Sequence, residues 1–313
     1  MINLICSRMT RPILCGVLFV SMLSMFPLRA EKPEVLQRAW QEYQFLSMDA
    51  AKTLFKRAEK LDTEPQYLLE AKLGLAMVSQ FREQKKDLEL AEKLYQEVLA
   101  ENPSPEIRDL IYSFIADLHI SRGETEQALE MLNTLIESSL DSVVGQDALI
   151  RKTLLTMGDF GSPESLKAAQ ETEAALATMN LELTPERPYL VPLIDSLLGD
   201  IYFWLDEPEK ALTYLENFTK LGNAKTTSYG SQAGQLYQIA SIYELDLNQP
   251  EKAGYYYKRM IVEYPNNSNS YFALEKAIEF GAMNRKEVES MNLSGLTPEI
   301  IDELFAKAKE EKN

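Results

Sequence analysis

The most constraining feature of the sequence is a segment of 26 residues that occurs twice. It begins at Leu110 and again at Leu193, 83 residues further on (193 minus 110). The copies align without insertion or deletion and are identical at nine of the 26 positions, and several other positions exchange one apolar or aromatic residue for another. One repeated unit cannot bury its apolar face alone, so neighbouring units must stack. We therefore expect a repeat protein with an extended surface rather than an enclosed reaction pocket.

Apolar spacing within the repeat predicts helical hairpins. In the second helix of each unit, a small residue is followed four positions later by a larger one and three positions after that by an apolar one, which puts all three on one helical face. The small residues of these six sets are Ala51, Ala91, Ala128, Ala168, Ala211 and Ala253. The set at Ala168 is the weakest. In four units the first helix has a small residue 12, 13 or 17 positions before the alanine, namely Gly74, Ala116, Gly199 and Ala240.

Proline-glutamate pairs mark the expected helix starts. Seven such pairs begin at Pro33, Pro105, Pro163, Pro185, Pro208, Pro250 and Pro298. Proline costs no hydrogen bond at the first helical position, and a glutamate beside it meets the positive end of the helix dipole. We predict an all-α chain of about a dozen helices joined by short turns, with no strand. Terminal helices are expected at 271–280 and 298–309, with a loop or short turn over 283–296.

This pattern resembles the tetratricopeptide repeat (TPR) family. The residues that carry the resemblance are Leu73, Gly74, Ala91, Tyr95 and Pro103; Ala116, Gly123, Ala128 and Leu132; Leu198, Gly199, Tyr202 and Ala211; and Tyr243, Ala253, Tyr257 and Pro265. The resemblance implies a right-handed superhelical solenoid of antiparallel helix hairpins. About six hairpins would occupy residues 31–265, and capping helices with a charged tail would occupy 266–313.

The repeat length departs from that family. Successive alanines are 40, 37, 40, 43 and 42 residues apart, which exceeds the ~34 residues of a TPR. The additional residues can be placed in loops between helices. HEAT-like repeats run near this length and are the alternative, although they lack the spacing of a small residue and an aromatic residue four positions later.

Residues 1–30 have the pattern of an export signal. They contain three arginines, no acidic residue and a mostly apolar run over 13–26, which is shorter than the ~20 residues that cross a bilayer. We expect cleavage after Ala30, which makes the mature chain periplasmic or secreted. An uncleaved N-terminal membrane anchor is the second choice.

Cysteine use and net charge limit the possible functions. Cys6 and Cys15 both lie in the expected signal, so a mature chain of 283 residues (313 minus 30) would have no disulfide, cysteine nucleophile or thiolate metal site. The net charge is −16, and it becomes −19 when the three arginines of the signal are removed. Such a surface repels nucleic-acid phosphates and anionic lipids and favours partners with basic residues. We expect no nucleic-acid ligand and no membrane insertion after signal cleavage.

The sequence offers little for catalysis. His119 is the one histidine, and it occupies a position where the other hairpins have Tyr202 and Tyr243. We expect it to be a packed histidine with a satisfied ring nitrogen. A serine triad would need this histidine together with Asp117 and either Ser113 or Ser121, but no nucleophile turn accompanies them. No phosphate loop, calcium loop or zinc-binding helix motif occurs, so we predict a protein that is not an enzyme and has no cofactor and no metal.

The resemblance also implies a binding surface. In the TPR family, ligands usually lie on the concave side, against first-helix residues that flank the small position. Carried over to this chain, those residues are Trp40, Tyr43, Ser113, Asp117, Ser196, Asp200, Phe203, Trp204, Tyr237 and Glu244. Asp117 and Asp200 would offer a spaced pair of anions to lysine or arginine side chains of a peptide. Trp40 and Trp204 are expected to be exposed apolar anchors.

We therefore predict a non-enzymatic scaffold of the cell envelope that holds a protein or peptide on its concave face. Exported members of the TPR family are similar to envelope-assembly adaptors, and residues 257–265 look like repeats of such proteins. The alternative is an accessory subunit of a cell-wall lytic or envelope-assembly enzyme complex. A self-associating structural protein is a third possibility.

Overall fold

The computed structural model describes residues 32–61, 64–81, 86–180, 190–220, 232–291, 293 and 295–310. All regular structure in these ranges is helical, which confirms the predicted all-α fold class. The expected export signal, both cysteines and the proline-glutamate pair at Pro185 lie outside the described residues. The chain divides into two compact units, 1–155 and 156–313.

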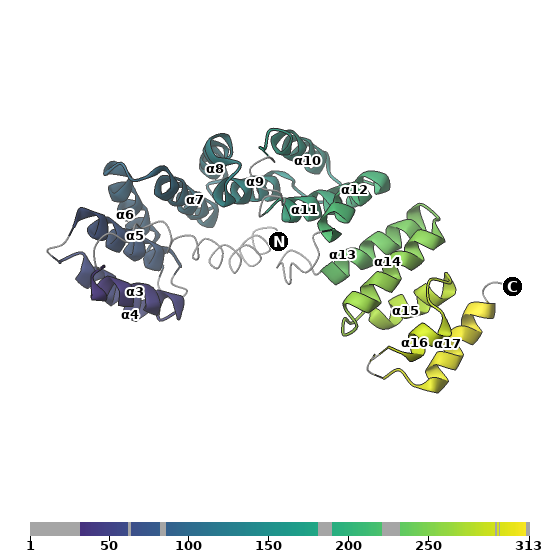
Figure 1. The fold of residues 1–313 in the computed structure, drawn as a ribbon. Helices are drawn as coiled ribbons and strands as arrows, with labels where there is room; N and C mark the ends of the chain where they lie inside the picture. Colours follow the sequence, from purple (N-terminus) through teal and green to yellow (C-terminus); the bar gives the residue numbers. More distant parts are fainter. Residues whose placement is uncertain are drawn as a thin grey trace. The chain divides into compact units, whose positions relative to one another are not determined.

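The first unit is built from helical hairpins. Its helices are α3 (Glu34–Gln44), α4 (Met48–Ala58), α5 (Pro65–Phe81), α6 (Leu88–Ala100), α7 (Pro105–Arg122), α8 (Thr125–Ser139) and α9 (Val143–Thr156). Consecutive helices pack as the pairs α3 with α4, α5 with α6 and α7 with α8, and α4 also packs against α5 (Figure 1). Helices α3 to α8 therefore bury their apolar sides against sequence neighbours.

The second unit repeats this arrangement. Its helices are α10 (Pro163–Leu176), α11 (Val191–Trp204), α12 (Pro208–Thr219), α13 (Gln232–Ser241), the π-helical segment η2 (Ile242–Asp246), α14 (Pro250–Glu263), α15 (Ser270–Glu279), α16 (Arg285–Glu289) and α17 (Pro298–Glu310). The pairs are α11 with α12 and α13 with α14, and α14 also packs against α15. Helices α15 and α17 match the predicted terminal helices, and the short helix α16 lies in the segment expected to be a loop or turn.

The small residues explain why the hairpins close. All six alanines of the repeat are buried, with at most 3% of their surface exposed. A Cβ atom added to Gly74 would lie 2.3 Å from the ring of Phe55, and one added to Gly199 would lie 2.5 Å from the Leu215 side chain. Both distances are shorter than van der Waals contact, so the neighbouring helices come this close only because the glycines have no side chain.

The π-helical segment follows from the spacing of the repeat. The small residue of the first helix lies 12 residues before the alanine at Gly199 and Ala211, but 13 residues before it at Ala240 and Ala253. In η2 the Leu247 amide donates to the Ile242 carbonyl, five residues back. A wider turn of this kind accommodates one additional residue without ending the helix.

Tyrosines join the hairpins of the second unit. The Glu216 carboxylate on α12 accepts hydrogen bonds from the hydroxyls of Tyr243 and Tyr256, at 2.7 and 2.8 Å. The two rings stack at 5.7 Å between centroids. The same arrangement occurs one repeat earlier with Glu173, Tyr202 and Tyr214. Burial and the nearby carboxylate raise the pKa of all four phenols, which therefore remain hydrogen-bond donors at neutral pH.

Candidate protein-binding surface

The first helices carry the residues predicted to bind a partner, and the structure shows what these residues contact. On α3, Trp40 is only 5% exposed, and its indole Nε1 donates to the Glu70 carboxylate on α5 at 2.6 Å. Its ring packs edge-on against Phe55 and Tyr43. The expectation of an exposed anchor is wrong for Trp40, because the ring fills the space between α3, α4 and α5. Tyr43 is buried beside it.

Ser113 and Asp117 on α7 are paired with an arginine of α9. The Arg151 guanidinium donates to Ser113 Oγ at 2.8 Å, to the Ser113 carbonyl at 3.1 Å and to Asp117 at 3.0 Å. Asp147 lies 2.5 Å from the same guanidinium. Burial raises the pKa of Asp147 to about 6 and outweighs the opposing effect of Arg151. Asp117 thus already has an arginine partner inside the chain, and its contact with a cation of a binding partner stays a prediction.

Ser196 and Asp200 occupy the same two positions on α11, but their partners on α13 are amides. Gln235 Nε2 donates to Ser196 Oγ at 2.9 Å, and Gln238 hydrogen-bonds to Asp200. Burial raises the pKa of Asp200 to about 6, although the bond from Gln238 opposes this shift. Ser196 is buried, whereas Asp200 keeps partial access to solvent.

Tyr237 and Glu244 continue the same series toward α15. The Tyr237 ring lies 5.9 Å from the Phe272 ring of α15. Glu244 accepts from the Tyr257 hydroxyl at 2.7 Å and pairs with Lys276 of α15 at 2.8 Å. Both residues therefore connect α13 and η2 to the next hairpin.

Most of these contacts share one pattern, because they join a residue of one first helix to the next first helix within its unit. The partners lie 30 to 39 residues further along the chain in the hydrogen bonds of Trp40, Ser113 and Ser196. Sequence reasoning missed the partners, which are Glu70, Arg151, Gln235, Gln238, Phe272 and Lys276. A signal was present for the residues that have such a partner, since the separation from the partner is equal to or somewhat shorter than the repeat length of 37 to 43 residues.

Phe203 and Trp204 at the end of α11 are more accessible. Trp204 is 61% exposed, which agrees with its expected exposure, and Phe203 is partly exposed. The Trp204 ring contacts Phe203 edge-on at 5.9 Å and Phe160, from the turn before α10, at 6.5 Å. Sequence reasoning did not include Phe160. Of the ten predicted residues, Trp204 presents the largest exposed apolar side chain, and the role of all ten in binding a partner stays a prediction.

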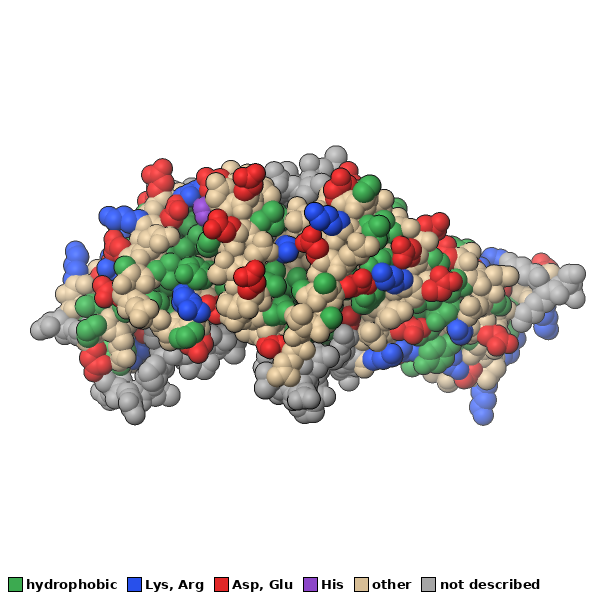
Figure 2. Space-filling view, turned by 90° about the horizontal axis from the view of Figure 1, so that it is seen from above, with side chains coloured by type: hydrophobic (Ala, Val, Ile, Leu, Met, Phe, Trp, Pro, Cys, Tyr) green, Lys and Arg blue, Asp and Glu red, His purple; other side chains and the backbone are tan. Residues whose placement is uncertain are grey.

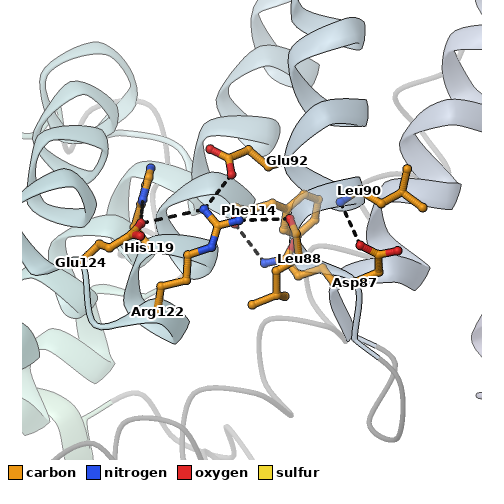
Figure 3. Close-up of polar contacts among 9 residues, drawn as sticks. Asp87, Leu88, Leu90, Glu92, Phe114, His119, Arg122 and Glu124 are labelled. Atoms are coloured by element: carbon orange, nitrogen blue, oxygen red, sulfur yellow. Dashed lines mark hydrogen bonds and ion pairs between the residues drawn. The ribbon is translucent and has the colours of Figure 1, made fainter.

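The histidine has the environment that was expected. His119 Nδ1 lies 2.6 Å from the Glu124 carboxylate at the start of α8, and the neighbouring Arg122 pairs with Glu92 at 2.6 Å (Figure 3). The prediction of a packed histidine with a satisfied ring nitrogen is confirmed. Ser113, the serine of the alternative triad, instead accepts a hydrogen bond from Arg151.

Most acidic side chains lie on exposed helix faces. Figure 2 shows them scattered over the face it presents, interspersed with Lys and Arg. Among the described residues, no group of three or more His, Cys, Asp or Glu could hold a metal ion. None of the helices in those ranges is both long enough and apolar enough to cross a bilayer.

Comparison with known proteins identifies the repeat. The family model described as Tetratricopeptide repeat matches residues 236–267, which cover most of α13, η2 and α14. This segment of the chain is similar to a tetratricopeptide repeat. The predicted resemblance to the TPR family is thereby confirmed, and the TPR fold suggests a protein-interaction scaffold. TPR proteins are generally non-catalytic.

A solved structure similar to this chain is that of a tetratricopeptide repeat protein from Parabacteroides merdae ATCC 43184. The two are 17% identical with a TM-score of 0.47, and the alignment covers 88% of this chain and 98% of the other. No curated protein matches the chain.

Proposed function

We propose that the chain is a non-enzymatic scaffold of the cell envelope that holds a protein or peptide with basic residues on the first-helix face of its TPR hairpins. The observation that carries this proposal is the TPR match over the hairpin of α13 and α14. In that hairpin, and in those of α7 and α11, the buried polar groups connect helices to one another. They form structural contacts rather than a convergent reaction site.

Net charge supports the preference for a basic partner. The chain carries 48 acidic and 32 basic residues, a net charge of −16. A surface of this sign speeds the approach of cationic partners and repels nucleic acid. Binding should therefore weaken as salt concentration rises, because salt screens charges at the surface.

The N-terminal sequence supports export. Arg8 and Arg11 precede the apolar run over 13–26, and Ala30 ends the segment. Fractionation of cells that make the full chain with a C-terminal tag tests this part of the proposal. We expect the tag in the periplasm or medium and a mature N-terminus at Glu31, while a variant without residues 1–30 stays in the cytoplasm. Recovery of the full-length chain in the membrane fraction would favour the anchored alternative.

Capture from the native envelope tests the binding function. Tagged residues 31–313 are incubated with intact envelope, fixed with a short amine-to-carboxylate cross-linker, and analysed by mass spectrometry. We expect one predominant partner, joined through its lysines to acidic residues of this chain, and less capture at high salt. The absence of any specific cross-linked partner would contradict the scaffold function.

Incubation with purified peptidoglycan separates the scaffold from the enzymatic alternative. The scaffold should release no soluble glycan fragments. Release of fragments by this chain alone would overturn the non-enzymatic assignment.

A further inference from the structure

Three aromatic rings of the second unit form a cluster at the surface. Phe160 and Trp204 are 41% and 61% exposed, and Phe203 is partly exposed. Their rings contact one another at 5.9 to 6.5 Å between centroids. We call these three residues the aromatic cluster. Trp40, the other tryptophan of the chain, is by contrast buried in a helix interface.

The backbone of the turn that carries Phe160 lies close to the backbone at the end of α11. The turn that carries Phe160 includes Gly161, which has a φ of +81°. A Cβ atom there would lie 2.7 Å from the Trp204 carbonyl oxygen, so the turn reaches the end of α11 because residue 161 has no side chain. The cluster thus brings together two chain segments that are more than 40 residues apart.

Local charge around the cluster is negative. The segments 157–167 and 200–210, which contain the three rings, have six acidic residues and two basic ones, Lys167 and Lys210. These acids are Asp159, Glu164, Asp200, Asp206, Glu207 and Glu209. Asp206 also contributes to the raised pKa of Asp246 in η2, so a further carboxylate lies near this end of α11. Negative charge beside exposed aromatic faces favours a cation and disfavours phosphates and anionic lipid head groups.

We propose that the aromatic cluster binds a lysine or arginine side chain of the partner protein, with the cation against the face of Trp204. This inference rests on the proposed function, and it specifies the chemistry of one contact. The chain already uses the same interaction internally. Lys210 Nζ on α12 lies 3.8 Å from the centroid of the Tyr202 ring, and Tyr202 is on α11, the helix that also carries Trp204. Tryptophan is the strongest of the aromatic residues in this interaction.

Binding of labelled cationic peptides tests the proposal. The probes are fluorescein-labelled octalysine and octaarginine, with fully side-chain-acetylated octalysine as the uncharged control, and the readout is anisotropy. Trp204→Leu should weaken binding of the charged peptides by about 2- to 30-fold, the range expected for loss of one cation–π contact. Tyr255→Leu is the matched control, because Tyr255 is 56% exposed on α14 and outside the cluster. Its affinity should equal that of the wild-type protein.

Tryptophan fluorescence gives a second readout with unlabelled peptides. The chain has two tryptophans, Trp40 and Trp204. Charged peptides should change the emission of the wild-type protein but leave that of Trp204→Leu unchanged, since only the buried Trp40 then remains. Equal peptide affinities for the wild-type and Trp204→Leu proteins, or no emission change on binding, would overturn the proposal. Sedimentation adds one further outcome, because dimers lost in Trp204→Leu would mean that a second copy occupies the cluster.

Envelope capture distinguishes failure of this inference from failure of the proposed function. A partner captured equally by the wild-type and Trp204→Leu proteins would remove the role of the cluster and leave the scaffold function in place. If neither protein captures a partner, the scaffold function fails as well.

Discussion

The segments at Leu110–Asp117 and Leu193–Asp200 are two copies of one sequence pattern, but they join their neighbours by different chemistry. In the first copy, Ser113 and Asp117 meet the guanidinium of Arg151. In the second copy, Ser196 and Asp200 meet the amides of Gln235 and Gln238. The serine and aspartate positions are the same, while within the described part of the chain a cationic partner is found only at the first junction.

This difference changes what each aspartate contributes. Asp117 shares a buried arginine with Asp147, so the charges at the junction of α7 and α9 are balanced in part. At the junction of α11 and α13 the partner of Asp200 is neutral, and burial raises the pKa of Asp200 to about 6. A carboxylate that is poorly compensated within the chain is a candidate for function. Equivalent repeat positions therefore both bond to the next first helix, but with different partners and different energetics.

Removal of the cation should have the largest effect. We expect Arg151→Met to destabilise the first unit by about 3–5 kcal/mol, the usual cost of leaving a buried charge without its partner. Arg151 and Asp147 have side chains only 3% and 5% exposed, so solvent cannot replace the lost contact. Urea unfolding monitored by circular dichroism gives the measurement.

Arg57→Met is the matched control, because Arg57 lies on α4 of the same unit and is exposed. It should change stability by less than about 0.5 kcal/mol. Adding Asp147→Asn to Arg151→Met should restore part of the loss, because the unpaired carboxylate is then removed. Equal effects of the two arginine substitutions would show that the buried network adds nothing to stability.

Neutralising Asp200, at the junction of α11 and α13, should increase stability rather than decrease it. The folded-state pKa of Asp200 is raised from 3.8 to about 6. Its contribution to stability is therefore fully present below pH 3.8 and is lost as the pH rises through about 6. Asp200→Asn removes this penalty and keeps a group that can bond to Gln238. We expect it to stabilise the second unit by about 1–3 kcal/mol at pH 7.

Unfolding curves at pH 4 and pH 7 measure this effect. Asp147 titrates in the same range, so the test is the difference between the wild-type and Asp200→Asn proteins at each pH. The stabilisation should be present at pH 7 and nearly absent at pH 4. An equal gain at both values would mean that packing rather than charge is responsible.

The turns that end the first helices also differ between the two units, and this difference should have a smaller effect on stability. Leu46 in the first unit and Asp206 in the second occupy equivalent positions in these turns, with φ values of 59° and 60°. In both turns the next amide donates to a carbonyl five residues back. Aspartate tolerates this left-handed conformation better than leucine does, and Leu46 is also 77% exposed. We expect Leu46→Gly to raise stability by about 0.5–1 kcal/mol.

Thermal unfolding can resolve this difference when Asp206→Gly serves as the control. That substitution should change stability by only a few tenths of a kcal/mol, because aspartate is already accommodated there. A loss of stability in Leu46→Gly would show that the exposed leucine is held by contacts within the chain.

The sequence predicted the hairpins because their determinants are local. Buried alanines at helical spacing and glycines at close approaches are visible in short windows, as at Ala211 and Gly199. The binding surface was harder to predict, since helix periodicity shows which residues share a helix face but not which other residues cover that face. Trp40 was expected to be exposed, and it is instead covered by Phe55 and hydrogen-bonded to Glu70. Contacts of this kind join helices that are not adjacent in sequence.

The amide junction itself should be the least sensitive site. Gln235→Leu removes the 2.9 Å hydrogen bond to Ser196, a loss of about 1 kcal/mol. It also removes Gln235 Oε1, a buried oxygen for which no hydrogen-bond partner is found among the described residues. The two effects oppose each other, so we expect a net change within about 1 kcal/mol in urea unfolding. A loss as large as that of Arg151→Met would mean that neutral and charged junctions contribute equally, and the contrast between the two copies would then have no energetic basis.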